Sequence, residues 1–373
     1  MTELSNTIDM KVAIIHHWLI GMRGGEKVLE SLCEMFPKAE LFTHVYNPSA
    51  ISDVIKKHRI NTTFIQRLPG SRHYYKNYLP LMPLALEQLD LRGYDLVISI
   101  ESGPAKGVIV PPNTLHICYC NTPMRYLWDL YHEYLKEGNK IKRLLLLPFV
   151  HYLRLWDFLS AARVDYFIAN SEHVQKRIMK YYRRESEVIY PPVDTEAFAP
   201  SEERGDFYLM VGQLVRYKRP DLAVEAFNKT KKRLIVIGEG EQMSALKKAA
   251  GPTISFLGWQ PFPVLRDHYA RCRALIFPGE EDFGMVPVEG MASGRPVIAF
   301  KRGGALETVV EGETGIFFDH ADVESLIEAI NRYERIEEQF SSKVIIEQAK
   351  KFDQQHFKRK MEQTIGRMIT KGI

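Results

Sequence analysis

The fold of this chain is decided by one stretch, Ala274-Leu-Ile-Phe-Pro-Gly-Glu-Glu-Asp-Phe-Gly-Met-Val-Pro-Val-Glu-Gly290. Its apolar start, Ala274–Phe277, predicts a buried strand. Pro287–Ser293 predicts a short helix with proline near its start, where a missing N–H group costs little. An acidic loop with a glycine joins the two. A strand, a loop and a helix in this order form the repeating unit of parallel α/β sheets.

The same alternation of strands and helices extends in both directions along the chain. Further strands are expected at Lys11–His16, Leu96–Ile100, Leu115–Tyr119, Asp165–Ala169, Glu187–Tyr190, Phe207–Gly212, Arg233–Ile237, Ile254–Leu257 and Pro296–Ala299. Pro191, Pro192 and the polar run Asp194–Gly205 interrupt the series, because proline cannot extend a sheet. We therefore predict an α/β protein with two Rossmann-like domains, residues 1–195 and 196–352, facing a central cleft in which a ligand binds.

Length and composition agree with two soluble domains. The chain has 373 residues, more than one hydrophobic core usually holds. Hydrophobic residues make up 45% and charged residues 26%, which excludes long disorder and an integral membrane protein. The apolar run Leu144–Val150 is interrupted by Pro148 and is too short to span a bilayer.

The N-terminal segment and the cysteines predict a cytoplasmic protein. Met1–Met10 has neither a basic nor an apolar segment of the kind found in secretion signals. The four cysteines, Cys33, Cys118, Cys120 and Cys272, contain no CxxC pair, so a zinc ribbon or a thioredoxin-like site is not expected. A reducing compartment is the simplest interpretation.

Positive charge is concentrated in one part of the chain. Ile51–Arg184 has 20 Lys and Arg against 11 Asp and Glu, whereas the whole chain has a net charge of only +4. Such a segment favours an anionic partner, namely phosphate, lipid headgroups or nucleic acid. A solvated surface with extra lysines would explain the same bias.

Two carboxylates in the deciding stretch are candidate sugar-binding groups. Glu281 falls in the loop and Glu289 on the helix, eight residues later. A carboxylate accepts two hydroxyl hydrogen bonds, which suits a ribose or hexose diol. The backbone N–H groups of Gly284–Val286 lie at the helix start, where phosphate oxygens bind. The placement of glycine and proline argues against a simple acidic helix cap.

Cations follow the first strand of the second domain. Arg216, Lys218 and Arg219 come after Phe207–Gly212, at the carboxyl end of a strand, where they would hold a diphosphate. Surface charge next to a helix would produce the same pattern.

The first domain has two loops of interest. Gly21-Met-Arg-Gly-Gly-Glu-Lys27 follows the first strand and offers free helix N–H groups to an anion, although an ordinary strand-to-helix turn is equally consistent with it. Asn121, Thr122 and Arg125 follow another strand and would lie on a loop at the cleft. His116 lies within that strand and is expected to be packed and hydrogen-bonded.

Several motifs are missing, and their absence limits the chemistry. The chain has no D-x-D, HExxH, P-loop, GxSxG or GxGxxG sequence. A metal site and a nicotinamide-dependent dehydrogenase are therefore not expected. If a sugar diphosphate is cleaved here, Lys, Arg and helix dipoles must stabilise the leaving group.

Taken together, these motifs resemble the retaining glycosyltransferases of family four, which have the GT-B fold. The resemblance rests on the E-x7-E motif Glu281–Glu289, the Gly24–Gly25 turn, the Gly212…Lys218 segment, Tyr190-Pro-Pro-Val-Asp194 and Gly303-Gly-Ala-Leu-Glu-Thr308. Ala274–Gly284 together with Thr122-Pro-Met-Arg-Tyr-Leu-Trp128 resembles GDP-mannose-dependent mannosyltransferases of bacterial O-antigen and exopolysaccharide assembly.

The resemblance implies the reaction and the roles of individual residues. Mannose would move from GDP-mannose to a hydroxyl of a glycan or lipid-linked glycan, with retention and without a metal or other cofactor. Lys218 and Arg216 would hold the diphosphate, Glu281 the sugar hydroxyls and Glu289 the ribose. The remaining contacts would come from the backbone of Phe283, Gly284 and Met285, from Gly24 and Gly25 at the phosphate, and from Asn121. The helix within residues 353–373 would pack back on the first domain, which binds the acceptor.

Two positions depart from the family pattern. Relatives have Arg where this chain has Gln213, and His before Thr-Pro where it has Asn121. Asn donates a hydrogen bond but cannot become cationic. A catalytically weak or inactive nucleotide-sugar-binding homologue, or a transferase that uses a UDP-sugar, therefore remains an alternative. A nucleic-acid-binding protein would also use the basic segment, but the resemblance implies no nucleic acid partner.

The basic segment also predicts where the acceptor is presented. Lys56, Lys57, Arg59, Arg67, Arg72 and Lys76 accompany Tyr74, Tyr75, Tyr78 and Leu79–Leu86, and Lys140, Lys142 and Arg143 precede Leu144–Val150 and Trp156. Such residues suit the surface of an anionic membrane, here the inner face, which would present an acceptor on a polyprenyl diphosphate. Core helix faces with solvated lysine edges would explain the pattern equally well.

Overall fold

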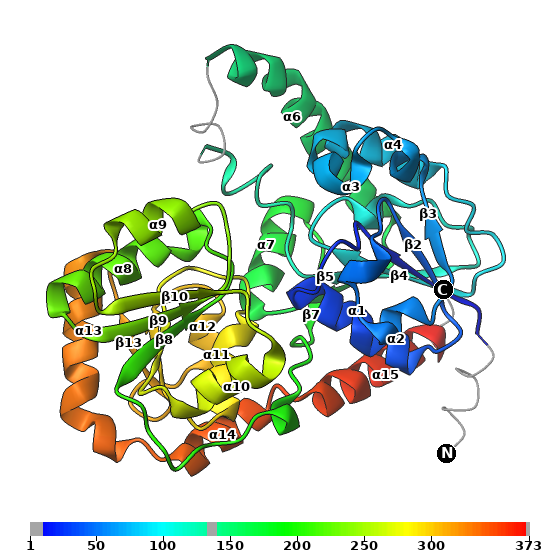
Figure 1. Cartoon of the computed structure of the whole chain (residues 1–373). Coiled ribbons are helices and arrows are strands. Elements are labelled where there is room, and N and C mark those ends of the chain that lie inside the picture. The colour runs from blue at the N-terminus through cyan, green and yellow to red at the C-terminus, as the bar shows by residue number, and fades with distance from the viewer. Residues whose placement is uncertain (1–9, 133–139, 371–373) are drawn as a thin grey trace. The chain divides into compact units, whose positions relative to one another are not determined.

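The computed structural model describes residues 10–132 and 140–370 of the chain (Figure 1). It divides into two compact units. The first contains Met1–Tyr190 and Phe357–Ile373, and the second contains Pro191–His356. The sequence-based prediction placed the divisions at residues 195 and 352 instead.

The first unit is built on a seven-stranded parallel sheet with the order β3-β2-β1-β4-β5-β6-β7. The central strands β1, β4 and β5 are fully buried, because helices cover both faces of a parallel sheet. The strands are β1 Val12–His16, β2 Glu40–Thr43, β3 Ile60–Thr62, β4 Leu96–Glu101, β5 Leu115–Cys120, β6 Tyr166–Ala169 and β7 Ser186–Val188.

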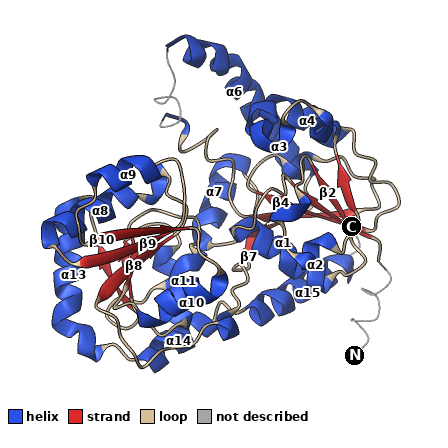
Figure 2. Ribbon diagram, viewed as in Figure 1, coloured by secondary structure: helices blue, strands red, loops and turns tan. Residues whose placement is uncertain are grey.

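Helices flank this sheet, as Figure 2 shows. They are α1 Gly24–Met35, α2 Asp53–Lys56, α3 Ser71–Tyr74, α4 Met82–Glu87, α6 Lys140–Ser160, α7 Glu172–Tyr182 and α15 Gln354–Thr370. The C-terminal helix α15 runs beside α1 and α2 (Figure 1), and its residues Phe357, Met361, Ile365 and Met368 are buried in the same core as β1 and α1. The chain therefore returns to the first unit at its end.

The second unit repeats this architecture with a six-stranded parallel sheet of order β10-β9-β8-β11-β12-β13. Its strands are β8 Phe207–Val211, β9 Arg233–Ile237, β10 Ile254–Gly258, β11 Leu275–Phe277, β12 Val297–Phe300 and β13 Gly315–Phe318. Its helices are α8 Pro220–Thr230, α9 Met243–Ala249, α10 Phe262–Arg271, α11 Met285–Ala292, α12 Ala305–Thr308, α13 Val323–Ile336 and α14 Ser342–Lys350.

Both sheets have a point at which the strand order reverses. In the first sheet it lies between β1 and β4, and in the second between β8 and β11. In folds of this kind, ligands bind at such a point, outside the carboxyl ends of the strands. The predicted fold class, two Rossmann-like domains with parallel sheets, is confirmed.

Some elements differ from the sequence-based expectation. Strands β2, β3 and β13 were not expected, because they are short and two of them lie at sheet edges. Helix α1 begins at Gly24, so the two glycines are helical rather than part of a turn. Helix α11 begins at Met285, two residues before the expected start. The four cysteines are free and buried.

Candidate active site

The loops after β8 and β11 bring two predicted site residues into contact. Lys218 closes a short 3₁₀ turn, Arg216–Lys218, and its Nζ lies 2.8 Å from Glu281 Oε1 in the loop after β11. Both side chains are mostly buried, with 15% and 18% of their surface exposed. Burial alone would lower the pKa of Lys218, but Glu281, and with it Glu289, raises that pKa above its ordinary value. The ammonium therefore stays charged at the edge of the sheet.

Glycines allow the backbones of these loops to touch. A Cβ on Gly279 would lie 2.5 Å from the Cα of Lys218, closer than real side-chain atoms come. Gly303 has a φ of +62°, and a Cβ there would collide with the carbonyl oxygen of Glu281. Gly304 donates its N–H to that same oxygen at 2.9 Å. A side chain at Gly279 would push the Glu281 loop away from Lys218, and one at Gly303 would push the loop after β12 away from Glu281.

Helix α11 places Glu289 and the predicted phosphate-binding backbone. Gly284 caps the helix with a φ of +83°, a conformation that favours glycine. Met285 is the first helical residue, so its N–H group has no partner within the helix. The neighbouring Phe283 side chain is buried and packs edge-on against Phe352, with 5.5 Å between the ring centroids.

Glu289 has a partner that the sequence did not indicate. Its Oε2 accepts a hydrogen bond of 2.7 Å from the hydroxyl of Tyr269 on α10. Tyr269 is fully buried, and burial together with the Glu289 carboxylate raises its pKa well above the ordinary value. The neutral hydroxyl fixes one carboxylate oxygen and thereby orients the other. Arg216 is exposed, two residues before Lys218.

In the first unit the predicted residues gather at the end of β1 and β5. Gly24 and Gly25 open helix α1, and Asn121 follows β5 directly. A Cβ on Gly25 would lie 3.5 Å from both Asn121 Nδ2 and His16 Cε1. The prediction missed His16, the last residue of β1, because it was read only as part of a strand. His116 is packed as expected, with Nε2 2.9 Å from the Ser99 hydroxyl, and burial lowers its pKa to about 4.

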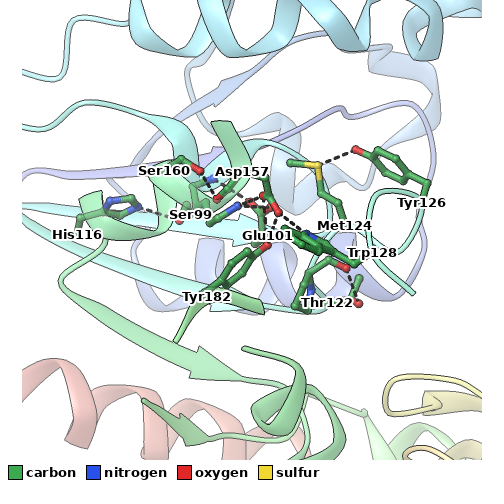
Figure 3. Close-up of polar contacts among 12 residues, drawn as sticks. Ser99, Glu101, His116, Thr122, Met124, Tyr126, Trp128, Asp157, Ser160 and Tyr182 are labelled. Carbon is green, nitrogen blue, oxygen red and sulfur yellow. Dashed lines mark hydrogen bonds and ion pairs between the residues drawn. The ribbon is translucent and has the colours of Figure 1, made fainter. Parts of the chain in front are cut away.

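A buried ionic cluster lies behind the Asn121 loop, and no sequence motif indicated it. Lys106 contacts both Glu101 and Asp157, and all three side chains are fully buried. Asp157 also accepts hydrogen bonds from Trp128 Nε1 at 2.7 Å and from the Tyr182 hydroxyl at 3.0 Å, as Figure 3 shows. Desolvation, reinforced by Asp157 and opposed by Lys106, raises the pKa of Glu101 to about 7.

This cluster holds the loop at both ends. The carbonyl oxygen of Glu101 accepts the N–H groups of Asn121 at 2.7 Å and Thr122 at 3.3 Å. The far end is held through Trp128, whose ring also stacks on Tyr181 with 5.0 Å between centroids. The position of Asn121 therefore depends on charges buried in the domain core.

Parts of the basic segment are surface and parts are core. Tyr74 is 63% exposed, whereas Tyr75 and Trp156 are buried. The expectation that Trp156 lies at a membrane surface is therefore wrong: its Nε1 donates to Glu87 Oε1 at 2.9 Å inside the domain. The side chains of Lys140, Lys142, Arg143 and Leu144–Leu146 lie outside the described residues.

Metal ligands and membrane spans were sought in the described residues. Within 10–132 and 140–370, no three His, Cys, Asp or Glu side chains group as they would around a metal ion. Over the same residues, every helix is too short or too polar to cross a bilayer. Metal-independent chemistry stays a prediction.

Two family matches together cover most of the chain. Residues 22–197 match the family described as Glycosyltransferase Family 4. Residues 193–352 match the family described as Glycosyl transferases group 1. The two matches overlap at residues 193–197, shortly after the division between the two units at Pro191.

Individual relatives are more distant. An alpha-1,3/1,6-mannosyltransferase of Dictyostelium discoideum is 25% identical over 271 residues, covering 59% of this chain and 62% of the relative. A GDP-mannose-dependent alpha-(1-6)-phosphatidylinositol monomannoside mannosyltransferase of Mycolicibacterium smegmatis is 29% identical over 174 residues, covering 39% and 46%. The chain spans about half the length of the curated relatives that it matches.

A solved structure gives the same fold. Anabaena HepE, determined with UDP and glucose, matches with a TM-score of 0.70 at 16% identity, covering 95% of this chain and 99% of HepE. At this identity the likeness shows the fold alone. Both domains thus match glycosyltransferase families, the two-domain fold is that of the GT-B glycosyltransferases, and the relatives of the chain include mannosyltransferases.

Proposed function

We propose that this chain is a retaining glycosyltransferase that moves mannose from GDP-mannose to a hydroxyl of a glycan or lipid-linked glycan. The observation that carries the proposal is the Lys218–Glu281 pair at the carboxyl edge of the second sheet, beside the start of α11. A cation, a carboxylate and free helix N–H groups are the groups that a sugar diphosphate requires.

The chemistry of each group follows from its hydrogen-bonding capacity. The Lys218 ammonium has three N–H donors, so it can keep its ion pair with Glu281 and still donate a hydrogen bond to a diphosphate oxygen. Glu281 then accepts hexose hydroxyls, and Glu289, held by Tyr269, accepts the ribose diol with its second oxygen. Arg216 and the N-terminus of α11 add positive potential for the leaving diphosphate.

Retention at the sugar carbon follows if the acceptor hydroxyl attacks on the face from which the diphosphate departs. The carboxylate beside Lys218, Glu281, is assigned to the sugar hydroxyls, so the proposal includes no covalent nucleophile. Charge that develops on the leaving oxygen is then stabilised by Lys218 and helix N–H groups, without a metal.

The nature of the donor is supported by the relatives. The relatives from Dictyostelium and Mycolicibacterium are named as mannosyltransferases, and the second as GDP-mannose-dependent. A UDP-sugar is the second candidate, because HepE was determined with UDP and glucose. An inactive sugar-binding homologue is the third, because of Gln213 and Asn121.

A nucleotide-sugar screen tests the proposal. The melting temperature is measured with GDP, UDP and ADP and with their sugars, and transfer is followed with radiolabelled donors. Selective binding raises the melting temperature by mass action, and we expect the largest rise with GDP-mannose. Equal or larger shifts of the melting temperature with UDP-sugars would reject GDP-mannose as the donor. Binding of a nucleotide sugar with neither transfer to an acceptor sugar nor hydrolysis would support the inactive homologue.

We further propose that the enzyme works at an anionic membrane surface through α6. This helix exposes Leu147, Phe149, Tyr152, Leu155, Phe158 and Leu159. Leu153 and Trp156 of the same helix are buried in the domain core. An apolar helix face within a basic segment suits insertion at lipid headgroups, where a polyprenyl-diphosphate acceptor would be presented.

A further inference from the structure

We propose that His16, held by Glu26, forms with Asn121 a binding site for a sugar hydroxyl at the carboxyl end of the first sheet. The inference rests on the proposed function, because it assumes that a sugar is bound. It assigns roles to His16 and Glu26, which no motif in the sequence indicated.

The site lies where the first sheet reverses its strand order. His16 ends β1 and pairs in register with Ile100 of β4. Only 2% of its surface is exposed. Its Nε2 lies 3.5 Å from Glu26 Oε1 on α1, and Glu26 Oε2 accepts the N–H of Arg23 at 3.0 Å. Glu26 is therefore fixed at both carboxylate oxygens, and the imidazole at one nitrogen.

The tautomer of His16 follows from this contact. An ionised carboxylate only accepts hydrogen bonds, so the hydrogen of a neutral imidazole belongs on Nε2. Nδ1 then carries a lone pair. Among the described residues, His16 Nδ1 and Asn121 Nδ2 are both buried without a hydrogen-bond partner. Buried polar groups are ordinarily satisfied, so two such atoms in one place indicate a missing ligand.

Gly25 leaves space for that ligand. A Cβ at Gly25 would lie 3.5 Å from Asn121 Nδ2 and from His16 Cε1, the ring carbon next to Nδ1. Apart from the chain neighbours of Gly25 and the backbone of α1, no other heavy atom lies within 4 Å of that point. The missing side chain at Gly25 therefore leaves open space beside both side chains, which a ligand group can approach.

The chemistry of the site favours a hydroxyl. Nδ1 requires a hydrogen-bond donor, and the Asn121 amide requires an acceptor. A sugar hydroxyl is both at once, whereas an ionised phosphate has no hydrogen to offer Nδ1. The hydroxyl can belong to the transferred hexose or to the acceptor glycan, and the experiment below separates these two sources.

The neighbouring His17 adds no positive charge to the site. The His17 ring lies 4.5 Å from the His16 ring, centroid to centroid. Burial, with contributions from His16, His44 and Arg23, lowers the pKa of His17 well below its ordinary value. His17 is therefore neutral, and Glu26 is the side chain that contacts His16 Nε2.

Two substitutions of His16 distinguish binding of a sugar hydroxyl by Nδ1 from structural support of Glu26 by Nε2. The amide of Gln reaches the Nε2 position and keeps the contact with Glu26, whereas Asn places its oxygen near the Nδ1 position. If Nδ1 binds a hydroxyl, His16→Gln should raise the sugar KM or Kd about five- to tenfold, and His16→Asn should raise it less. If His16 only supports Glu26, His16→Asn should raise the sugar KM or Kd more than His16→Gln.

Two more variants address the same site without removing the imidazole. Glu26→Gln presents an amide N–H to Nε2, which moves the imidazole hydrogen to Nδ1 and should weaken sugar binding like His16→Gln. Gly25→Ala fits the backbone of α1 and should not lower the melting temperature, because alanine is the better helix former. Its methyl group would point into the space beside Asn121 and His16 and should weaken sugar binding as well.

The measurements use the whole chain with GDP-mannose and UDP-glucose as donors and methyl α-mannoside as the acceptor probe. If the variants lose affinity only for the donor sugar, the difference in Kd between GDP-mannose and GDP becomes smaller. This result assigns the hydroxyl to the hexose. A loss confined to methyl α-mannoside assigns it to the acceptor. His116→Gln is the matched control, because His116 is equally buried but has both ring nitrogens occupied. It should change stability but not the KM values.

The two hypotheses fail in different ways. If the wild-type chain neither binds nor turns over any nucleotide sugar, the proposed function fails. If the wild-type chain is active and His16→Gln and Gly25→Ala retain its KM and Kd values for both sugars, the hydroxyl site is overturned while the proposed function stands.

Discussion

Lys218 and Glu281 form an ion pair across two loops of the second domain, with 2.8 Å between Nζ and Oε1. The loops leave β8 and β11, the neighbouring strands between which the sheet order reverses. The sequence assigned one residue to the diphosphate and the other to the sugar. Their contact places a phosphate-binding cation and a hydroxyl-binding carboxylate within reach of one ligand.

Replacing Lys218 with alanine should abolish most of the turnover. A group placed where negative charge develops typically contributes a factor of about 10²–10³ to kcat, and we expect a loss of that size. Lys229→Ala is the control, because Lys229 forms only exposed ion pairs, with Glu324 and Glu225 on the same domain. Both variants are compared by kcat and by melting temperature. Near-normal turnover in Lys218→Ala would contradict its role at the leaving group.

Removal of divalent metal should leave transfer unchanged. Lys218, Arg216 and the start of α11 are expected to carry the charge of the leaving diphosphate. Initial rates are measured before and after treatment with EDTA and after gel filtration. Complete inhibition that is restored by Mg²⁺ or Mn²⁺ would show that the leaving group needs a metal.

The exposed face of α6 should control membrane binding. Phe149 and Leu155 are 50% and 52% exposed, and each apolar side chain transferred from water contributes about 1.5–3 kcal/mol. Phe149→Ser with Leu155→Ser should therefore lower cosedimentation with anionic liposomes by about tenfold or more. Trp259→Ser, at a 71% exposed residue of the second domain, should not. Binding that is equal on neutral liposomes and insensitive to salt would reject the membrane surface.

The buried cluster should make stability depend on pH through Glu101. Its pKa rises from 4.5 to about 7 in the folded chain, so the folded state holds a proton that the unfolded state has released. This contribution is complete below pH 4.5 and is lost as the pH rises through 7. Glu101→Gln is neutral throughout, so its melting temperature should rise relative to wild type between pH 5 and pH 8. A constant difference across that range would show that Glu101 does not titrate there.

Lys106 should contribute strongly to the stability of the buried cluster that holds the Asn121 loop. Lys106→Met leaves Glu101 and Asp157 buried without their cation, and removing one partner of a buried ion pair costs about 3–5 kcal/mol. We expect a large drop in the free energy of unfolding, measured by urea denaturation. Arg92→Met, at an exposed ion pair with Asp90, is the control and should lower the free energy of unfolding far less, because solvent screens this pair. Equal losses in the two variants would show that the cluster contributes no more than a surface pair.

The sequence alone determined the fold class and half of the candidate site. The strand Arg233–Ile237 was predicted with its observed ends, because a run of apolar residues between a polar start and glycines has few other structures. Lys218, Glu281 and Glu289 were found because each lies within a continuous motif next to a predicted strand. Information of this kind is local, so it can be read from neighbouring residues.

Tertiary structure decided which distant residues meet. His16 and Glu26 are separated by the turn between β1 and α1, and Lys106 and Asp157 by 51 positions of the chain. No spacing rule links such residues, because the order of strands in the sheet sets their distance. Trp156 was expected at a surface and is buried, because the side of α6 that faces the domain depends on how the helix packs. The sequence therefore defined the elements and the local motifs, whereas long-range packing determined which charges are desolvated and which ring nitrogen is left for a ligand.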